Sequence, residues 1–347
     1  MKILIYSDPH FCQYSSIVRS NGEKYSTRLE NLIKSLNWVE ETAQKENCDT
    51  IICAGDFFDK AELNAQEITA LSDVKFDEKI AHYYLCGNHE MGAYNHKYSS
   101  TKIFDGYDNS FSIDKPFCLH DDSAEILFLP YLLEKERKTV HDYVEEYIAD
   151  KGKIIVVMSH NNIKMNYGGY FLEDGFDIED IVHNCDWFFN GHLHNGGFIE
   201  KYQNIINIGN LTGQNFSENA FLYSHGIYII DTDHLNMAEE LKYIENPFAF
   251  NFYKVDFTTS TEYSALKKNA VVSLVCYEED IEKYRSSFCD SGIISFKIQA
   301  KQRKANEIKK EQDEQIEAID HIQKFRDFVL SEIGSDDIIK SELSFIG

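Results

Sequence analysis

Residues 51–59 read Ile51-Ile52-Cys53-Ala54-Gly55-Asp56-Phe57-Phe58-Asp59, an apolar run that ends in a glycine and a carboxylate. Four further segments repeat this pattern, in which a short apolar run leads into polar side chains that can bind a metal ion. They are Ile3–Tyr6 before Asp8-Pro9-His10, Tyr83–Cys86 before Gly87-Asn88-His89-Glu90, Ile155–Met158 before Ser159-His160, and Trp187–Asn190 before Gly191-His192-Leu193-His194. Because the carboxyl ends of parallel strands share one edge of a sheet, we expect these polar groups to lie together.

The first two thirds of the chain alternates between apolar strand-like runs and amphipathic helical patterns. Leu29, Leu32, Ile33 and Leu36 repeat at helical spacing after the first apolar run. Further helices are predicted at 64–71, 134–149 and 178–183, and further strands at 204–208 and 226–230. This alternation predicts an α/β fold whose sheets are largely parallel and flanked by helices.

A second unit is predicted after Pro247. Residues 252–298 follow the order strand, helix, strand, helix, strand, which is typical of a small α+β domain. Residues 301–317 are densely charged, and the apolar positions from Ile316 to Ile333 then lie on one face of a final helix. We therefore divide the chain into a catalytic domain (1–245), a capping domain (246–300) and a charged linker with an amphipathic helix (301–347).

The composition limits the classes of function. The formal net charge of −24 argues against a protein that holds nucleic acid by bulk basic charge, although bound cations or a basic partner can offset it locally. The eight cysteines form no closely spaced pair, so we expect neither a disulfide framework nor a zinc knot. No signal peptide or membrane span is visible, so we expect a cytoplasmic protein, in the host cytoplasm if phage-encoded.

The donor set of the five motifs indicates a pair of metal ions. It combines imidazole, carboxylate and amide oxygen without cysteine, which suits manganese, iron or zinc better than calcium. Seven candidate ligands suggest two ions about 3.5–4 Å apart, bridged by Asp56, as in two-metal phosphoesterases. The adjacent His89 is a candidate for stabilising charge or protonating a leaving group. The seven candidates are Asp8, His10, Asp56, Asn88, His160, His192 and His194.

The order and content of these motifs resemble the calcineurin-like metallophosphoesterase superfamily over residues 1–231. The resemblance implies a layered sandwich with a dinuclear centre and His89 as the catalytic histidine. It also implies that Asp8, His10, Asp56 and His194 hold one ion, and that Asp56, Asn88, His160 and His192 hold the other. Glu90 departs from the aspartate usual in that family, and Asp59 matches a position that varies between its branches. We therefore give both residues supporting roles beside the ligands.

A narrower resemblance is to the nuclease subunits of double-strand-break repair complexes, the SbcD type and its short phage relatives that act as recombination endonucleases. It rests on the Gly-Asp-Phe-Phe-Asp string at 55–59, on the turn at 207–210 that leads into 214–218, and on the overall layout. The resemblance implies a DNA exonuclease or endonuclease in recombination, repair or replication. The final helix would dock on an SMC-like ATPase, and Mn²⁺ is the most expected ion, with Mg²⁺, Fe²⁺ or Zn²⁺ as alternatives.

Two other functions stay open. The acidic charge favours a phosphoesterase for small molecules or phosphoproteins, and the fold could also serve as a non-catalytic scaffold. The sequence leaves open the metal, the cleavage polarity, the strand preference and homodimer formation. The remaining histidines lack motif context, and we interpret them as structural or surface residues: His82, His96, His120, His141, His183, His225, His234 and His321.

Overall fold

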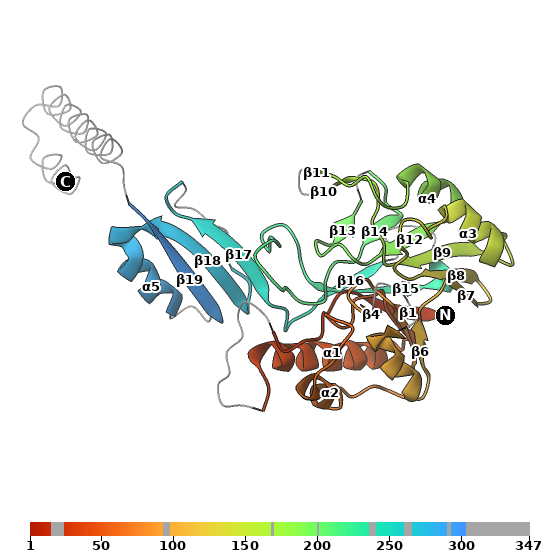
Figure 1. Cartoon of the computed structure of the whole chain (residues 1–347), viewed down its shortest axis with the longest axis horizontal. Helices are drawn as coiled ribbons and strands as arrows, with labels where there is room; N and C mark the ends of the chain where they lie inside the picture. The colour runs from red at the N-terminus through yellow and green to blue at the C-terminus, as the bar shows by residue number, and fades with distance from the viewer. Residues whose placement is uncertain are drawn as a thin grey trace, which may run out of the picture.

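Two mixed β-sheets pack face to face in the computed structural model of this 347-residue chain, and helices cover their outer faces (Figure 1). The structure describes residues 1–14, 24–92, 98–167, 170–199, 201–235, 241–259, 266–289 and 293–302. The layered α/β class that the sequence predicts is confirmed.

The first sheet has the strand order β16-β15-β1-β2-β3-β6. Its parallel strands are β1 (Lys2–Tyr6), β2 (Thr50–Cys53), β3 (Ala81–Leu85) and β6 (Ser110–Ile113). Its antiparallel strands are β15 (Gly226–Asp231) and β16 (Lys242–Glu245). Three of the five predicted metal-binding segments therefore follow strands of this sheet, namely β1, β2 and β3.

The second sheet has the order β13-β14-β12-β9-β8-β7. Its parallel strands are β8 (Ala124–Leu129), β9 (Ile154–Ser159), β12 (Trp187–Asn190) and β14 (Ile205–Asn207). The edge strands β7 (Phe117–His120) and β13 (Gly197–Phe198) are antiparallel. The other two metal-binding segments follow β9 and β12, so the predicted gathering of polar groups is shared between two sheets and does not lie on one edge.

Short elements complete the main domain. Two-stranded ribbons are formed by β4 (Met91–Gly92) with β5 (Tyr98–Ser99), and by β10 (Asn166–Tyr167) with β11 (Tyr170–Phe171). The 3₁₀ helices η1 (Ser100–Gly106) and η2 (Thr232–His234) lie in connections.

Four helices lie on the outer faces of the sandwich. They are α1 (Thr27–Glu46) and α2 (Ala65–Leu71) on the first sheet, and α3 (Val140–Tyr147) and α4 (Ile178–Asn184) on the second (Figure 1). Helix α3 is shorter than the predicted helix 134–149. It begins at Val140 because Thr139 and Asp142 form a capping box, which satisfies the free N–H groups of the first turn.

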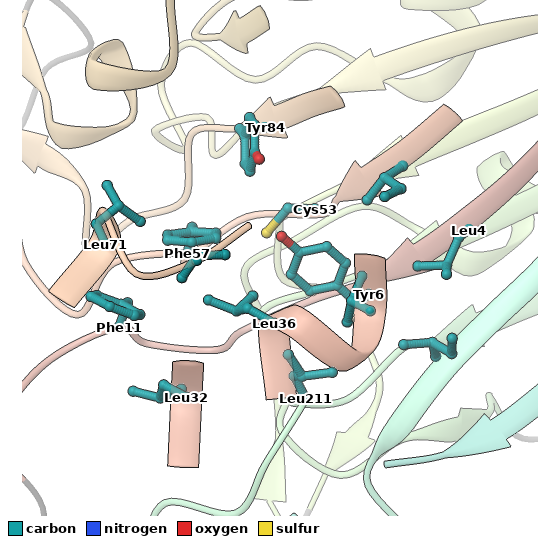
Figure 2. Close-up of a cluster of buried hydrophobic side chains, with 14 of the residues drawn as sticks. Leu4, Tyr6, Phe11, Leu32, Leu36, Cys53, Phe57, Leu71, Tyr84 and Leu211 are labelled. Atoms are coloured by element: carbon teal, nitrogen blue, oxygen red, sulfur yellow. The ribbon is translucent and has the colours of Figure 1, made fainter. Parts of the chain in front are cut away.

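Apolar side chains fill three layers of the sandwich. Ile3, Ile52 and Phe189 belong to the core between the two sheets. Figure 2 shows the layer between the first sheet and its helices, where Phe57 and Tyr84 pack among apolar side chains of other elements. Phe57 and Phe58, which directly follow Asp56 in the chain, are fully buried in this layer.

A smaller unit follows the main domain and lies to one side of it (Figure 1). It contains the parallel strands β17 (Asn251–Asp256), β18 (Ala270–Tyr277) and β19 (Ser295–Lys301), with η4 (Glu278–Asp280) and α5 (Ile281–Cys289). Tyr253, Val272 and Leu274 belong to a core of its own. We call this unit the cap.

Residues 303–347, which include the predicted C-terminal helix, lie outside the described residues, as does His96. None of the helices built from the described residues has the length and apolar content needed to span a lipid bilayer.

Candidate metal centre

The polar loops after the five strands have a backbone that only a few residue types adopt readily. Asp8, His10, Asp56 and His192 have φ values of 50°, 46°, 47° and 74°. The left-handed region is uncommon for residues other than glycine, and such residues cluster at functional sites. These turns direct the side chains toward a common centre at the carboxyl ends of the strands.

Glycines next to the ligands are required by close packing. A Cβ atom at Gly55 would lie 2.1 Å from Nδ1 of His160, and a Cβ at Gly87 would lie 2.1 Å from Oδ1 of Asp56. A Cβ at Gly191 would lie 2.3 Å from the Ser7 hydroxyl and 2.7 Å from Nδ1 of His160. The glycines of the motifs therefore make room for the ligand side chains.

One group of candidate ligands consists of Asp8, His10 and His194, whose ligand atoms lie within 4.8 Å of one another. Nε2 of His10 lies 3.2 Å from Nε2 of His194 and 3.7 Å from Oδ1 of Asp8. The Nδ1 atoms of the two rings face carboxylates, Asp59 at 3.1 Å and Glu218 at 3.4 Å. Because carboxylates accept hydrogen bonds, Nδ1 of His10 donates to Asp59 and its Nε2 is directed to the centre. The Glu218 carboxylate lies within ion-pair distance of the His194 ring.

A second group consists of Asp56, His160 and His192. Nε2 of His160 lies 3.1 Å from Oδ2 of Asp56, and Nδ1 of His160 donates to the Ala54 carbonyl at 2.7 Å. Nδ1 of His192 lies 2.9 Å from Oδ1 of Asn88. Oδ2 of Asp56 also lies 3.7 Å from Nε2 of His10. The Asp56 carboxylate is therefore situated between the first group of candidate ligands and the second.

Two buried atoms of the centre show that this donor set fits cations. Oδ1 of Asp8 and Nε2 of His160 are both buried without a hydrogen-bond partner. Since Nδ1 of His160 carries the proton given to Ala54, its Nε2 lone pair faces the Asp56 carboxylate. Nε2 of His160 and Oδ2 of Asp56 are both electron-rich and lie 3.1 Å apart in a buried site. They require a cation between or beside them, either a proton or a metal ion.

The electrostatics of the centre favour cationic histidines and anionic aspartates. Burial opposes protonation of His10, but Asp59 and Asp8 outweigh it and raise the pKa of His10 to about 10. Burial likewise opposes protonation of His160, while Asp56 raises its pKa to about 9. Burial and then His160 lower the pKa of His192 to about 4, so its ring is neutral. The carboxylates supply the negative potential that a pair of divalent ions would neutralise.

His89 lies at the mouth of the centre and is 42% exposed. Its Nδ1 lies 2.9 Å from the Asp59 carbonyl oxygen, which can only accept, so Nδ1 donates and Nε2 stays available. The ring of His89 contacts that of His10 edge-on, with ring centroids 4.7 Å apart. Asp59 thus contacts His10 with its carboxylate and His89 with its backbone.

Glu90 lies beneath the centre and is fully buried. Its carboxylate accepts from the backbone N–H groups of Phe58 at 3.0 Å and Gly87 at 2.7 Å. It therefore joins the Asp56 loop to the Asn88 loop. Burial and the nearby Asp56 carboxylate raise the pKa of Glu90 to about 8.

The structure brings all ten predicted site residues into one region, and it adds residues that sequence reasoning does not assign. Glu218 contacts His194 and also accepts from Nδ2 of Asn210 and the backbone N–H of Gln214, both at 3.0 Å. Ser7 donates to Oδ2 of Asp8. Sequence reasoning singles out the segment 214–218 only for its resemblance, because Glu218 does not directly follow a strand and is distant from the five motifs along the chain.

Comparisons with known proteins give one family match. Residues 1–196, more than half of the chain, match the family model described as calcineurin-like phosphoesterase. A search of curated proteins found no match.

Solved structures that match this chain include enzymes of phosphate ester hydrolysis. An archaeal phosphodiesterase is 16% identical over 71% of this chain and 99% of its own, with a TM-score of 0.35. A purple acid phosphatase from seeds of yellow lupin, Lupinus luteus, is 11% identical over 71% and 51%, with a TM-score of 0.45. A dimetal phosphatase from Danio rerio is 11% identical over 71% and 98%, with a TM-score of 0.39.

Proposed function

The chain belongs to the calcineurin-like phosphoesterase family, and on this premise we propose that it is a two-metal DNA nuclease that hydrolyses phosphodiester bonds. Members of the family are metal-dependent phosphoesterases with dinuclear centres, and the described residues include groups that can hold the two ions.

We assign the ligands as two sets that share Asp56. Asp8, His10, Asp56 and His194 hold one ion, and the other is held by Asp56, Asn88, His160 and His192. When bound, such a pair of ions stabilises charge on a phosphoryl group and lowers the pKa of water. Mn²⁺ suits this oxygen and nitrogen donor set, as do Mg²⁺, Fe²⁺ and Zn²⁺.

His89 acts on the substrate side of the centre. Its Nδ1–H is held by the Asp59 carbonyl, which fixes the orientation of the ring, and the partly exposed side chain keeps Nε2 available to a substrate. A protonated Nε2 can donate to a phosphate oxygen or to the leaving alkoxide, a contribution of about 10²–10⁴ in rate for a positioned acid.

The observation that carries the DNA assignment is the attachment of the cap to a loop of the metal centre. The backbone N–H of Gly213 donates to the carbonyl oxygen of Phe250, and the backbone N–H of Ala220 donates to the carbonyl oxygen of Phe252. Phe216 packs on Phe252 with ring centroids 5.0 Å apart. Glu218, which contacts His194, lies within this same loop. A second domain attached to a loop of the metal centre gives an extended polymer a surface that a small ester does not need.

One cation of the cap lies close to this attachment. Nζ of the exposed Lys297 lies 4.4 Å from the ring centroid of Phe216. An aromatic ring with a neighbouring cation suits nucleic acid, because bases stack on rings and phosphates pair with lysine. The net charge of −24 is unfavourable for DNA, so we propose that an SMC-like ATPase partner, bound through residues 301–347, supplies the cationic surface.

The acidic charge favours a second candidate, a phosphoesterase for small molecules or phosphoproteins. The two are separated by incubating the purified chain and Mn²⁺ with end-labelled linear DNA and, in parallel, with a bis-aryl phosphodiester. Each reaction is repeated with chelator and with His89→Ser, and the DNA reaction also with the ATPase partner. We expect DNA cleavage that chelator and the substitution abolish. Hydrolysis of the small ester alone, with DNA intact even when the partner is present, would refute the nuclease assignment and leave the phosphoesterase.

A further inference from the structure

A separate group of side chains with metal-binding chemistry lies on the hairpin of β7 and β8. It consists of Cys118, His120 and Glu125, whose ligand atoms lie within 4.8 Å of one another. His120 pairs directly with Glu125 in the hairpin, next to the amino end of β8. The metal centre lies beyond the carboxyl ends of the strands, so the two groups occupy opposite ends of the second sheet.

The strand register places the three side chains on one face. Cys118 and His120 are two residues apart on β7 and point to the same side, and directly paired residues of neighbouring strands also share a side. Cys118 belongs to the core beneath α3 and α4. The arrangement is therefore a consequence of the fold and does not depend on flexible loops.

The distances are close to those of a tetrahedral zinc site. Sγ of Cys118 lies 3.5 Å from Oε2 of Glu125 and 3.9 Å from Nδ1 of His120. In tetrahedral coordination a sulfur lies ~3.5 Å from nitrogen or oxygen ligands, and these lie ~3.3 Å from each other. Nδ1 of His120 is 2.6 Å from Oε2, so the imidazole must move outward slightly. Its side chain is 55% exposed and is free to do so.

Glu125 has one oxygen directed to this group and one directed away from it. Nζ of Lys153 lies 3.9 Å from Oε1, whereas the cysteine and the histidine both contact Oε2. Oε2 also receives the backbone N–H of Ala149 at 3.5 Å. Burial and then Glu125 raise the pKa of the Cys118 thiol to about 12, so without a metal ion the thiol is protonated and donates to Oε2.

We propose that Cys118, His120 and Glu125 form a mononuclear site for zinc or another thiophilic divalent ion, with the fourth position open to water. Thiolate, imidazole and carboxylate together favour such an ion over manganese or magnesium. Binding would release the thiol proton and tie β7 to β8 beside the end of α3. The site is independent of the DNA nuclease assignment. The proposal also replaces the interpretation of His120 as a structural or surface residue. The pairing of β7 with β8, and not a sequence motif, brings Glu125 next to His120.

Cobalt provides a probe that distinguishes this site from the dinuclear centre. A thiolate bound to Co²⁺ gives a charge-transfer band in the near ultraviolet, and none of the seven ligands assigned to the centre is a cysteine. The full chain is stripped of metal, kept reduced with a phosphine, and titrated with Co²⁺ alone. We expect the band to saturate at one thiolate-bound ion per chain and to disappear when zinc is added.

Matched variants assign the band to its ligands. Cys118→Ser should abolish it, whereas Cys185→Ser, which alters a buried cysteine of the same core, should retain it. His120→Ala removes an exposed side chain and should weaken cobalt binding by more than about tenfold, since even groups that only support ligands contribute tenfold or more. The exposed His141→Ala is its control. Absence of the band in the wild type would overturn the proposal without reference to any variant. A band that survives Cys118→Ser, or is lost in Cys185→Ser, would also overturn it.

Discussion

The carboxylate of Glu218 lies 3.4 Å from Nδ1 of His194, and the opposite nitrogen of that ring faces His10 at 3.2 Å. A carboxylate behind a ligating histidine fixes the tautomer and orientation of the ring, and loss of such a partner typically lowers metal affinity about 10–100-fold. Glu218 is itself held by Gln214 and Asn210 and is buried. The loop that supports the cap therefore also orients a ligand of the metal centre.

Glu218→Gln should weaken binding of one of the two Mn²⁺ ions by about 10–100-fold and leave the other nearly unchanged. The amide retains the size of the side chain but removes its charge. Metal titration of the stripped protein measures both affinities. Glu67→Gln is the control, because Glu67 is a buried carboxylate that caps α2 without contacting the centre. Equal losses in both variants would contradict the role given to Glu218.

Metal binding should release protons. At neutral pH the raised pKa values of His10 (about 10) and His160 (about 9) mean that both rings are protonated in the metal-free chain. Both values exceed the ordinary histidine pKa of about 6.5. Protonation of the two rings therefore stabilises the folded, metal-free chain fully below about pH 6.5, and this stabilisation is lost as the pH rises through 9–10. Metal affinity should accordingly rise with pH over this window. Calorimetry in buffers of different ionisation enthalpy counts the protons, and a count of zero would contradict the proposed ligands.

Gly191→Ala should disrupt the centre. The added methyl would lie 2.4 Å from the Ala54 carbonyl and 2.7 Å from Nδ1 of His160, so His160 must move. We expect metal affinity to fall at least about tenfold, by comparison with changes in groups that merely support ligands. Gly106→Ala is the control, since nothing lies within 4 Å of a Cβ there. If Gly191→Ala bound both ions as the wild type does, the packing argument would be wrong.

Glu90→Asp should lower the free energy of unfolding by about 1–3 kcal/mol, the usual cost of leaving a buried donor unpaired. The shorter side chain cannot reach both the Phe58 and the Gly87 N–H groups, which Glu90 now satisfies together. Urea denaturation of the metal-free chain measures the change. Glu136→Asp, at an exposed position, should stay within about 0.5 kcal/mol. A Glu90→Asp variant as stable as the wild type would show that the shorter carboxylate satisfies both groups.

His89→Ser should lower the rate constant for hydrolysis by about 10²–10⁴ while metal binding is unchanged. His89 contacts Asp59 and the edge of His10 but belongs to neither assigned ligand set. Steady-state kinetics with a bis-aryl phosphodiester, together with metal analysis of the same samples, separates these effects. Loss of a metal ion in the variant would instead make His89 a ligand.

The candidate ligands could be predicted from sequence because each directly follows a strand that an apolar run marks clearly. Asp56 after β2 and His160 after β9 are examples. The sequence did not predict that β9 and β12 belong to a different sheet from β1, since pairing partners depend on contacts distant in the chain. The edge strands β7 and β13 were missed because they are short and partly exposed. Glu218 was not assigned because its relation to His194 exists only in the folded loop.

The central claim is that Asp56 links two ions into one centre, and manganese electron paramagnetic resonance on the loaded chain tests it most directly. The expected result is two Mn²⁺ per chain with the multiline spectrum of an exchange-coupled pair, replaced in Asp56→Asn by signals of isolated ions or by loss of binding. Manganese has little preference for thiolate, so the Cys118 group should not contribute. A single bound ion in the wild type, or two ions without coupling, would contradict the account.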